Sequence, residues 1–203
     1  MLSKNIFTSD YIYERNSIYF AKFLKKLFND EKINLKKIKV LDFGCGPGTL
    51  HKYIKFKDLY TYDKFSIKAL KSKKNFKSFI KLKKTRNKFD LILINSVAQY
   101  IDHKNFSRIL NILFQKLQKK GIIFVGEVPK YNRFVELLLM FSPIKILYLF
   151  FYFIKRPSYI NQSYYLYNKS FFEKLLKKKI YLKFLSSNSF FFHKRFCVII
   201  KKL

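Results

Sequence analysis

The sequence has little cysteine, and this absence excludes several kinds of site. Only Cys45 and Cys197 occur among the 203 residues, so neither a disulfide framework nor a cysteine-based zinc site is available. The three histidines have no cysteine or acid at ligand spacing, and we expect no metal. Residues 1–10 lack the apolar core of a signal peptide. These features together favour a cytoplasmic protein.

Acidic residues are scarce as well. The chain carries 12 acidic and 43 basic residues and a formal net charge of +31. One explanation is an anionic partner, either nucleic acid or a membrane. The other is mutational drift, because Lys, Asn, Phe, Ile and Tyr all have A/T-rich codons. Only six of the basic residues are arginines, whereas phosphate-binding surfaces favour arginine. Drift is therefore favoured, and a nucleic-acid partner is considered but not favoured.

Three of the only five glycines gather in one short stretch. An apolar run over 38–43 ends at Gly44, Gly46 and Gly48, and a helix-like segment follows. This pattern predicts a buried strand, a tight turn and a helix. Glycine lets the backbone turn sharply and lets a ligand approach the main chain, while the free N–H groups of the helix attract electronegative ligand atoms.

The glycine spacing excludes two ligand classes. A dinucleotide fingerprint would need its third glycine at position 49, which is Thr49. The Gly-Lys-Ser/Thr ending of a phosphate-binding P-loop is also missing. The turn therefore predicts a ligand other than a pyrophosphate or a nucleoside triphosphate.

The string Asp42-x-Gly44-x-Gly46-x-Gly48 resembles motif I of the class I S-adenosylmethionine-dependent methyltransferases. The resemblance covers residues 38–129 well and the remainder loosely. It implies an α/β, Rossmann-like three-layer sandwich, with a mostly parallel sheet and a C-terminal antiparallel strand, in a single domain over 1–203. It also implies S-adenosylmethionine as the cofactor. This cofactor carries a sulfonium and an ammonium, so an acid at the strand end suits it.

The expected elements follow from periodicity, and residues 1–14 are expected to form a flexible flap. Strands are predicted at 38–43, 58–63, 76–80, 89–95, 121–126, 180–185 and 196–200, the last two as an antiparallel hairpin. Helices are predicted at 16–29, 48–55, 66–73 and 171–178, and along the stripe Phe106, Leu110, Leu113 and Leu117. Ser170 and Glu173 resemble a capping box at the start of helix 171–178.

The resemblance also implies a set of cofactor-binding residues. Asp63 follows the second strand, where an acid can accept both ribose hydroxyls. The acid that often follows the third strand is missing, since residues 81–84 read Lys-Leu-Lys-Lys, and Leu82 is the expected packing partner of adenine. The full expected set is Asp42, Gly44, Cys45, Gly46, Gly48, Asp63, Leu82, Asn95 and Ser96.

Two further strings resemble a subset of small-molecule methyltransferases: Ser96-Val-Ala-Gln-Tyr100 and Gly126-Glu-Val-Pro129. They imply O- or N-methylation of a small or medium-sized acceptor, with Glu127 as the candidate base and His103 as a weaker one. The expected acceptor-side residues are Gln99, Tyr100, Tyr131 and His193, and Tyr100 suits the core equally well. The alternatives are an RNA methyltransferase and a non-catalytic, membrane-associated relic of the fold.

Residues 131–156 form the most apolar part of the chain. Residues 137–154 contain one charged side chain, Lys145, and at about 1.5 Å per residue their helix would only just span a bilayer. Lys145 and Pro143 argue against a spanning helix. We expect a lid of two short helices over the site, or an interfacial segment at 134–156 that contacts the inner face of a membrane. The acceptor and the oligomeric state are not readable from these patterns.

Overall fold

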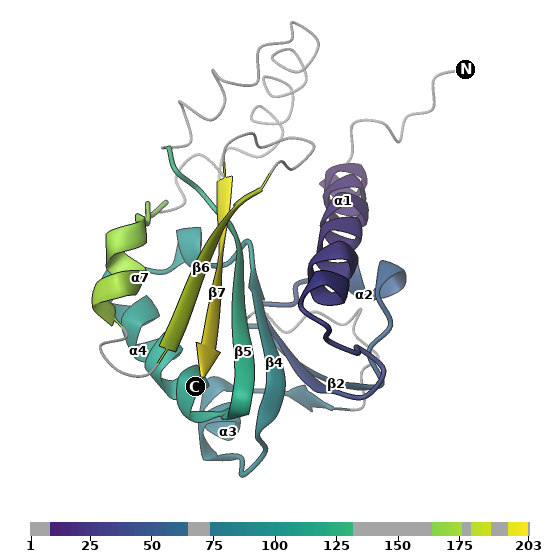
Figure 1. Ribbon diagram of the computed structural model, residues 1–203, viewed down its shortest axis with the longest axis horizontal. Helices are drawn as coiled ribbons and strands as arrows, with labels where there is room; N and C mark the ends of the chain where they lie inside the picture. Colours follow the sequence, from purple (N-terminus) through teal and green to yellow (C-terminus); the bar gives the residue numbers. More distant parts are fainter. Residues whose placement is uncertain (1–8, 65–73, 132–163, 176–179, 188–194, 203) are drawn as a thin grey trace, which may run out of the picture.

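The computed structural model describes residues 9–64, 74–131, 164–175, 180–187 and 195–202, and a seven-stranded sheet runs through them (Figure 1). The strands are β1 (Lys39–Phe43), β2 (Asp58–Tyr62), β3 (Asn75–Phe76), β4 (Phe89–Asn95), β5 (Leu117–Val128), β6 (Ile180–Ser187) and β7 (Arg195–Lys202). The helices are α1 (Ser9–Asp30), α2 (Leu50–Tyr53), α3 (Phe79–Lys84), the 3₁₀ turn η1 (Ala98–Tyr100), α4 (His103–Gln115) and α7 (Lys169–Leu175).

The strand order is β3-β2-β1-β4-β5-β7-β6. Strands β1 to β5 pair in parallel, and β7 is antiparallel to both β5 and β6. The expected Rossmann-like α/β fold with an antiparallel C-terminal strand is therefore confirmed. The order reverses between β1 and β4, and ligands of such sheets bind at the carboxyl ends beside this switch point. The glycine turn follows β1 at that place.

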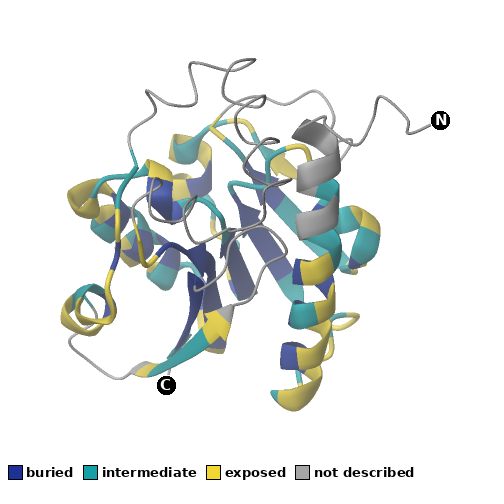
Figure 2. Ribbon diagram, turned by 90° about the horizontal axis from the view of Figure 1, so that it is seen from above, coloured by how far each residue is buried: buried dark blue, intermediate teal, exposed yellow. Residues whose placement is uncertain are grey.

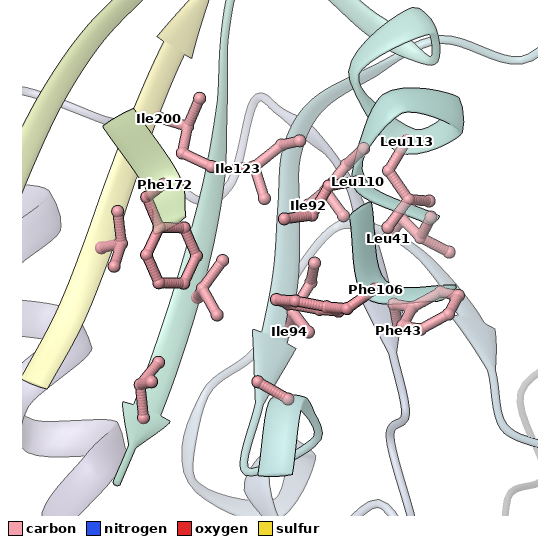
Figure 3. Packing of buried hydrophobic residues seen from close by; sticks show 14 of the residues in the cluster. Leu41, Phe43, Ile92, Ile94, Phe106, Leu110, Leu113, Ile123, Phe172 and Ile200 are labelled. Carbon is pink, nitrogen blue, oxygen red and sulfur yellow. The ribbon is translucent and has the colours of Figure 1, made fainter. Parts of the chain in front are cut away.

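Alternating side chains along each strand supply two cores, one on each face of the sheet. Figure 3 shows the core that contains Leu41 and Phe106. Leu41 and Phe43 of β1 face the side covered by α3, α4 and α7, where Phe106 and Phe172 pack. Val40, which precedes Leu41 and so points to the opposite face, packs on the side covered by α1 and α2. Seen from above, the sheet is a buried band between helices whose outer faces are exposed (Figure 2).

Several expected boundaries are wrong. Residues 9–14 belong to α1 rather than to a flap. The third strand stops at Phe76, because Ser78 accepts a hydrogen bond from the Lys81 N–H and so caps α3. Leu117 begins β5 instead of ending the preceding helix. The cap of α7 is Asn168, whose side chain accepts from the Phe171 N–H, so Ser170 lies inside the helix.

The apolar segment lies almost wholly outside the described residues, as do helix 66–73 and His193. The lid and the interfacial segment therefore stay expectations. In the part of the chain that is described, no helix combines the length and apolar character needed to cross a membrane.

Candidate functional site

The glycine turn has a backbone that other residues adopt only with strain. Gly44, Gly46 and Gly48 have φ values of +76°, +52° and +73°, the region that favours glycine. A Cβ on Gly44 would lie 2.3 Å from Cγ2 of Val97, so the loop after β4 packs directly on this residue. A Cβ on Gly46 would meet no described atom within 4 Å. Among the described residues, Gly46 therefore has free space where a side chain would lie, whereas Gly44 packs against Val97.

The turn is joined to the end of β2 by three hydrogen bonds. The Tyr62 carbonyl accepts from the N–H groups of Gly44 and Cys45 at 2.7 and 3.3 Å. Oδ2 of Asp63 accepts from the Gly46 N–H at 2.8 Å. Asp63 thus lies beside the turn as expected, and it also holds the turn in place.

Asp42 points to the α1 and α2 side of the sheet and meets a histidine there. Its Oδ2 lies 2.7 Å from Nε2 of His51, and the two side chains are only 4% and 14% exposed. His51 comes from α2, one turn beyond the glycines, and its ring packs edge-on against Phe56. The acid of the motif is therefore a member of a buried pair.

Cys45 shows that the electrostatic environment of the turn is negative. The pKa of its thiol is raised well above the usual value, first by burial and then by the negative charges of Asp42 and Asp63. The thiol therefore stays protonated and is not a nucleophile. Because two acids act on one small loop in a chain of net charge +31, the turn is a local anionic site that favours a cation over a phosphate.

The end of β4 lies against the end of β5. The Ser96 N–H donates to the Gly126 carbonyl at 3.1 Å, and Ser96 has a φ of +55°. Asn95 faces Gly126 so closely that a Cβ there would lie 2.6 Å from Asn95 Oδ1. This oxygen is buried and finds no hydrogen-bond partner among the described residues. A left-handed serine and an unsatisfied amide are the local strain expected at functional sites.

The loop after β4 is fastened by the chain that returns at residue 164. The carbonyl of Gln99 accepts from the Tyr165 N–H at 2.9 Å, and the Tyr167 hydroxyl donates to the Ile101 carbonyl. The Gln99 side chain is buried, and its Oε1 has no partner in the described part of the chain. The loop therefore holds a buried acceptor atom that no described residue satisfies.

His103 helps to hold the segment that returns at residue 164. Its Nε2 is 2.7 Å from the Leu166 carbonyl, so Nε2 carries the proton and donates. The ring packs against Tyr165, Tyr167 and Phe171. These contacts fix the orientation of the ring and leave Nδ1 as its acceptor nitrogen, so the role of His103 as a weaker candidate base stays a prediction.

Glu127 lies in a bulge at the end of β5. Gly126 and Glu127 together oppose the single residue Cys197 of β7, and Glu127 has a φ of +57° and is 6% exposed. Arg195, which is 4% exposed, donates to the Glu127 carbonyl at 3.3 Å and to the Tyr164 hydroxyl at 3.0 Å. Bulges of this kind re-aim side chains beside active sites, and here a buried cation supports the bulged peptide.

The remaining expected residues divide into three cases. Leu82 is fully buried in the core that includes Phe106, so the expectation that it packs on adenine is wrong. Tyr100 and Tyr131 are 37% and 38% exposed, which leaves both accessible at the carboxyl end of the sheet. His193 lies outside the described residues.

Sequence reasoning missed three contributors to this site: His51, Arg195 and Tyr164. The signal for His51 was its place one helical turn beyond the glycines, on the side of the sheet that Asp42 faces. The signal for Arg195 was an arginine at the start of a buried strand in a chain whose basic residues are mostly lysines. No pattern in the sequence indicated Tyr164. Among the described residues, no cluster of three or more His, Cys, Asp or Glu side chains could hold a metal ion.

Comparisons with known proteins agree with the family and the fold expected from the sequence. A family model described as a methyltransferase domain matches residues 12–178. No curated protein sequence matches the chain. The described fold is also similar to several solved structures. The magnesium protoporphyrin IX methyltransferase of Synechocystis PCC 6803, with bound SAH, is 15% identical with a TM-score of 0.60, over 98% of this chain and 97% of that one.

Two further structures show the same fold. DesVI of Streptomyces venezuelae is 11% identical with a TM-score of 0.63, over 97% of this chain and 99% of that one. The plantazolicin methyltransferase BpumL, in complex with SAH, is 17% identical with a TM-score of 0.56, over 98% of this chain and 86% of that one.

Proposed function

Because this chain belongs to the methyltransferase domain family, we propose that it transfers a methyl group from S-adenosylmethionine to a small or medium-sized acceptor. The anionic glycine turn carries the proposal. Asp42 and Asp63 both act on Cys45, and Gly46 borders open space. A cofactor with a sulfonium and an ammonium fits such a turn, whereas the pyrophosphate of NADH would be repelled.

The chain's own residues would bind and orient the reactants. Cofactor contacts are assigned to the turn, to Asp63 for the ribose hydroxyls, and to Asn95 and Ser96 at the end of β4. No acid follows the third strand, and the side chain of Leu82 is buried. Adenine would therefore be recognised by main-chain atoms and by other apolar side chains. When bound, the cofactor supplies an activated methyl group, and the protein's part is to align the acceptor with it and exclude water.

The acceptor side is assigned to the ends of β4 and β5. Glu127 would take the proton from the O–H or N–H group of the acceptor that receives the methyl group. Gln99 and Tyr100 would contact the acceptor, together with Tyr131 and His193. Among the structural neighbours, one is named for magnesium protoporphyrin IX and another for plantazolicin. This range supports a small or medium-sized acceptor and leaves O- and N-methylation both open.

Isothermal titration calorimetry on the purified full chain tests this proposal. S-adenosylmethionine and S-adenosylhomocysteine should bind, and NADH at the same concentrations should not. A matched pair of variants localises the binding: Gly46→Val should remove it, and Ile80→Ala, a change at a 64% exposed side chain, should retain it. Absence of binding at millimolar ligand would instead favour a non-catalytic relic of the fold.

A further inference from the structure

One side chain of the loop after β4 packs on the glycine turn. A Cβ built on Gly44 would have its three nearest described neighbours in Val97, with Cγ2 at 2.3 Å, Cγ1 at 3.3 Å and Cβ at 3.4 Å. The isopropyl group of Val97 therefore occupies the place that a side chain of residue 44 would take. The Gly44 N–H also donates to the Tyr62 carbonyl at 2.7 Å. Gly44 is thus held from both strands that flank β1, by a hydrogen bond at the end of β2 and by packing from the loop after β4.

The same loop is anchored further along to residues 164–168, the returning segment. The Tyr165 N–H donates to the Gln99 carbonyl at 2.9 Å, and the Tyr167 hydroxyl donates to the Ile101 carbonyl. Both hydrogen bonds are accepted by main-chain atoms of the loop. The returning segment therefore fixes the position of the loop backbone, and with it the place from which the loop reaches the turn.

Val97 joins two parts of the proposed site that come from different stretches of the chain. Cofactor contacts are assigned to the glycine turn, and acceptor contacts are assigned to Gln99 and Tyr100 in the loop. Close-packed protein interiors have low compressibility and transmit displacements from one group to the next. Because Val97 touches Gly44 and its own loop is bonded to the returning segment, a movement of any one of these parts is passed on to the others.

We infer that Val97 is a positioning residue, which holds the glycine turn in the shape that binds the cofactor and couples this turn to the returning segment. The inference rests on the proposed function and goes beyond it, because neither a cofactor contact nor an acceptor contact is assigned to Val97. Coupling between two sites is reciprocal. A cofactor that stabilises the returning segment is therefore bound more tightly when that segment is in place.

Calorimetry on the full chain tests the positioning role. Val97→Ala should raise the dissociation constants of S-adenosylmethionine and S-adenosylhomocysteine by about five-fold or more, the lower end of typical coupling between sites. Val97→Ile keeps both γ carbons and should stay near the wild type. The matched control is Val198→Ala, the same chemical change at a fully buried position on β7. It should lower the melting temperature and leave both dissociation constants unchanged, whereas a purely structural role would make the two valine-to-alanine variants behave alike.

A double variant tests the contact itself. Gly44→Ala places a Cβ 2.3 Å from Val97 Cγ2 and also strains the backbone, which has a φ of +76°. Val97→Ala removes both γ carbons and leaves its Cβ at 3.4 Å, an ordinary contact distance. The backbone strain is the same with either residue at position 97, so it cancels in the comparison. Gly44→Ala should therefore lower the melting temperature less in the Val97→Ala background than in the wild type. Additive losses would overturn the inference.

Hydrogen exchange tests the coupling to the returning segment. Saturating S-adenosylmethionine should slow exchange of the Tyr165 amide, which donates to the Gln99 carbonyl. This protection should be smaller in Val97→Ala, also at saturating ligand. The amides of β6, at the far edge of the sheet, serve as the internal control and should not change. The measurement on the wild type needs no variant and so does not depend on whether a variant folds.

The outcomes distinguish the inference from the function on which it rests. If the wild type and Val97→Ala bind S-adenosylmethionine equally well, the inference is wrong and the proposed function stands. The same holds if cofactor binding leaves exchange at Tyr165 unchanged. If the wild type binds neither ligand, the proposed function fails, and the inference fails with it.

Discussion

The main-chain N–H of Gly46 donates to Oδ2 of Asp63 at 2.8 Å, which joins the turn after β1 to the acid that follows β2. The two strands are parallel neighbours, and Phe43 pairs with Tyr62 at their carboxyl ends. Asp63 therefore has two roles in the proposed site. It shapes the turn that would hold the methionine part of the cofactor, and it offers a carboxylate for the ribose.

Substitutions of Asp63 should separate these roles. Asp63→Ala removes both and should weaken S-adenosylmethionine binding by about 1.5–3 kcal/mol, the usual size of a hydrogen bond to a charged group. Asp63→Asn keeps an oxygen for the Gly46 N–H but removes the charge, so its loss should be smaller. Calorimetry measures both. Equal losses in the two variants would mean that the charge alone matters.

The two glycines that differ in their surroundings should respond differently to substitution. Gly46→Val fills open space, so the fold should survive with a strain of about 1–2 kcal/mol from the left-handed backbone, while cofactor binding is abolished. Gly44→Ala drives a Cβ to within 2.3 Å of Val97 and should lower thermal stability more, although the added group is smaller. Thermal melts and ligand titrations on both variants check this. A larger loss of thermal stability in Gly46→Val than in Gly44→Ala would contradict the inference that Gly44 is the more tightly packed of the two glycines.

Glu127→Gln tests the proposed base. If Glu127 acts on the acceptor, cofactor affinity should stay near that of the wild type while turnover falls by about 10²–10⁴-fold. Transfer of a labelled methyl group to an acceptor, followed beside cofactor binding by calorimetry, separates the two quantities. If Glu127 only forms a structural ion pair, turnover should barely move. Arg195→Lys serves as the comparison, because it keeps the charge beside the Glu127 carbonyl but loses the planar guanidinium.

The ion pairs between Glu31, which directly follows α1, and the terminal hairpin should make the stability of the fold depend on pH in the acid range. The pKa of Glu31 is lowered by hydrogen bonds from Lys183 and then from Lys201. The pKa of Glu31 in the folded state lies below the ordinary 4.5. The stabilisation from its ion pairs is therefore complete above pH 4.5 and is lost as the pH falls further. Urea denaturation from about pH 6 to about pH 3.5 should show a shallower loss for Glu31→Gln than for the wild type. Parallel curves would contradict the prediction.

The apolar segment at 134–156 is expected to cover the site as a lid, or alternatively to contact anionic lipid at the inner face of a membrane. If it lies in the interface, the protein should pellet with anionic liposomes, and Leu149→Glu combined with Phe153→Glu should release it. The matched control is Ile80→Glu with Tyr181→Glu, which makes the same change in charge at exposed apolar positions elsewhere. Equal sedimentation of both double variants would leave the lid as the explanation.

Local patterns in the sequence were sufficient for much of the fold. The apolar run at 89–95 matches β4 at both ends, because a central parallel strand is buried on both faces and its composition marks it. The glycine spacing identified a strand, a turn and a helix because only glycine adopts that backbone without strain. Two boundaries were misplaced where a polar cap decided the outcome, at Ser78 and Asn168, and the largest error was at the start of α1, expected at residue 16 and found at Ser9. A cap depends on which of several nearby polar residues reaches the N–H groups.

The sequence by itself determined the fold class, the motif and the two acids at the strand ends, since each of these is a property of one short stretch. Only the tertiary structure decided how distant stretches meet: Asp42 with His51, and Arg195 with the Glu127 carbonyl. It also placed Leu82 in the core and His103 under the returning chain. The physical reason is that such contacts depend on strand order and register, and on which face of the sheet each side chain points to. A shift of one residue in any strand would exchange these partners without changing the local pattern.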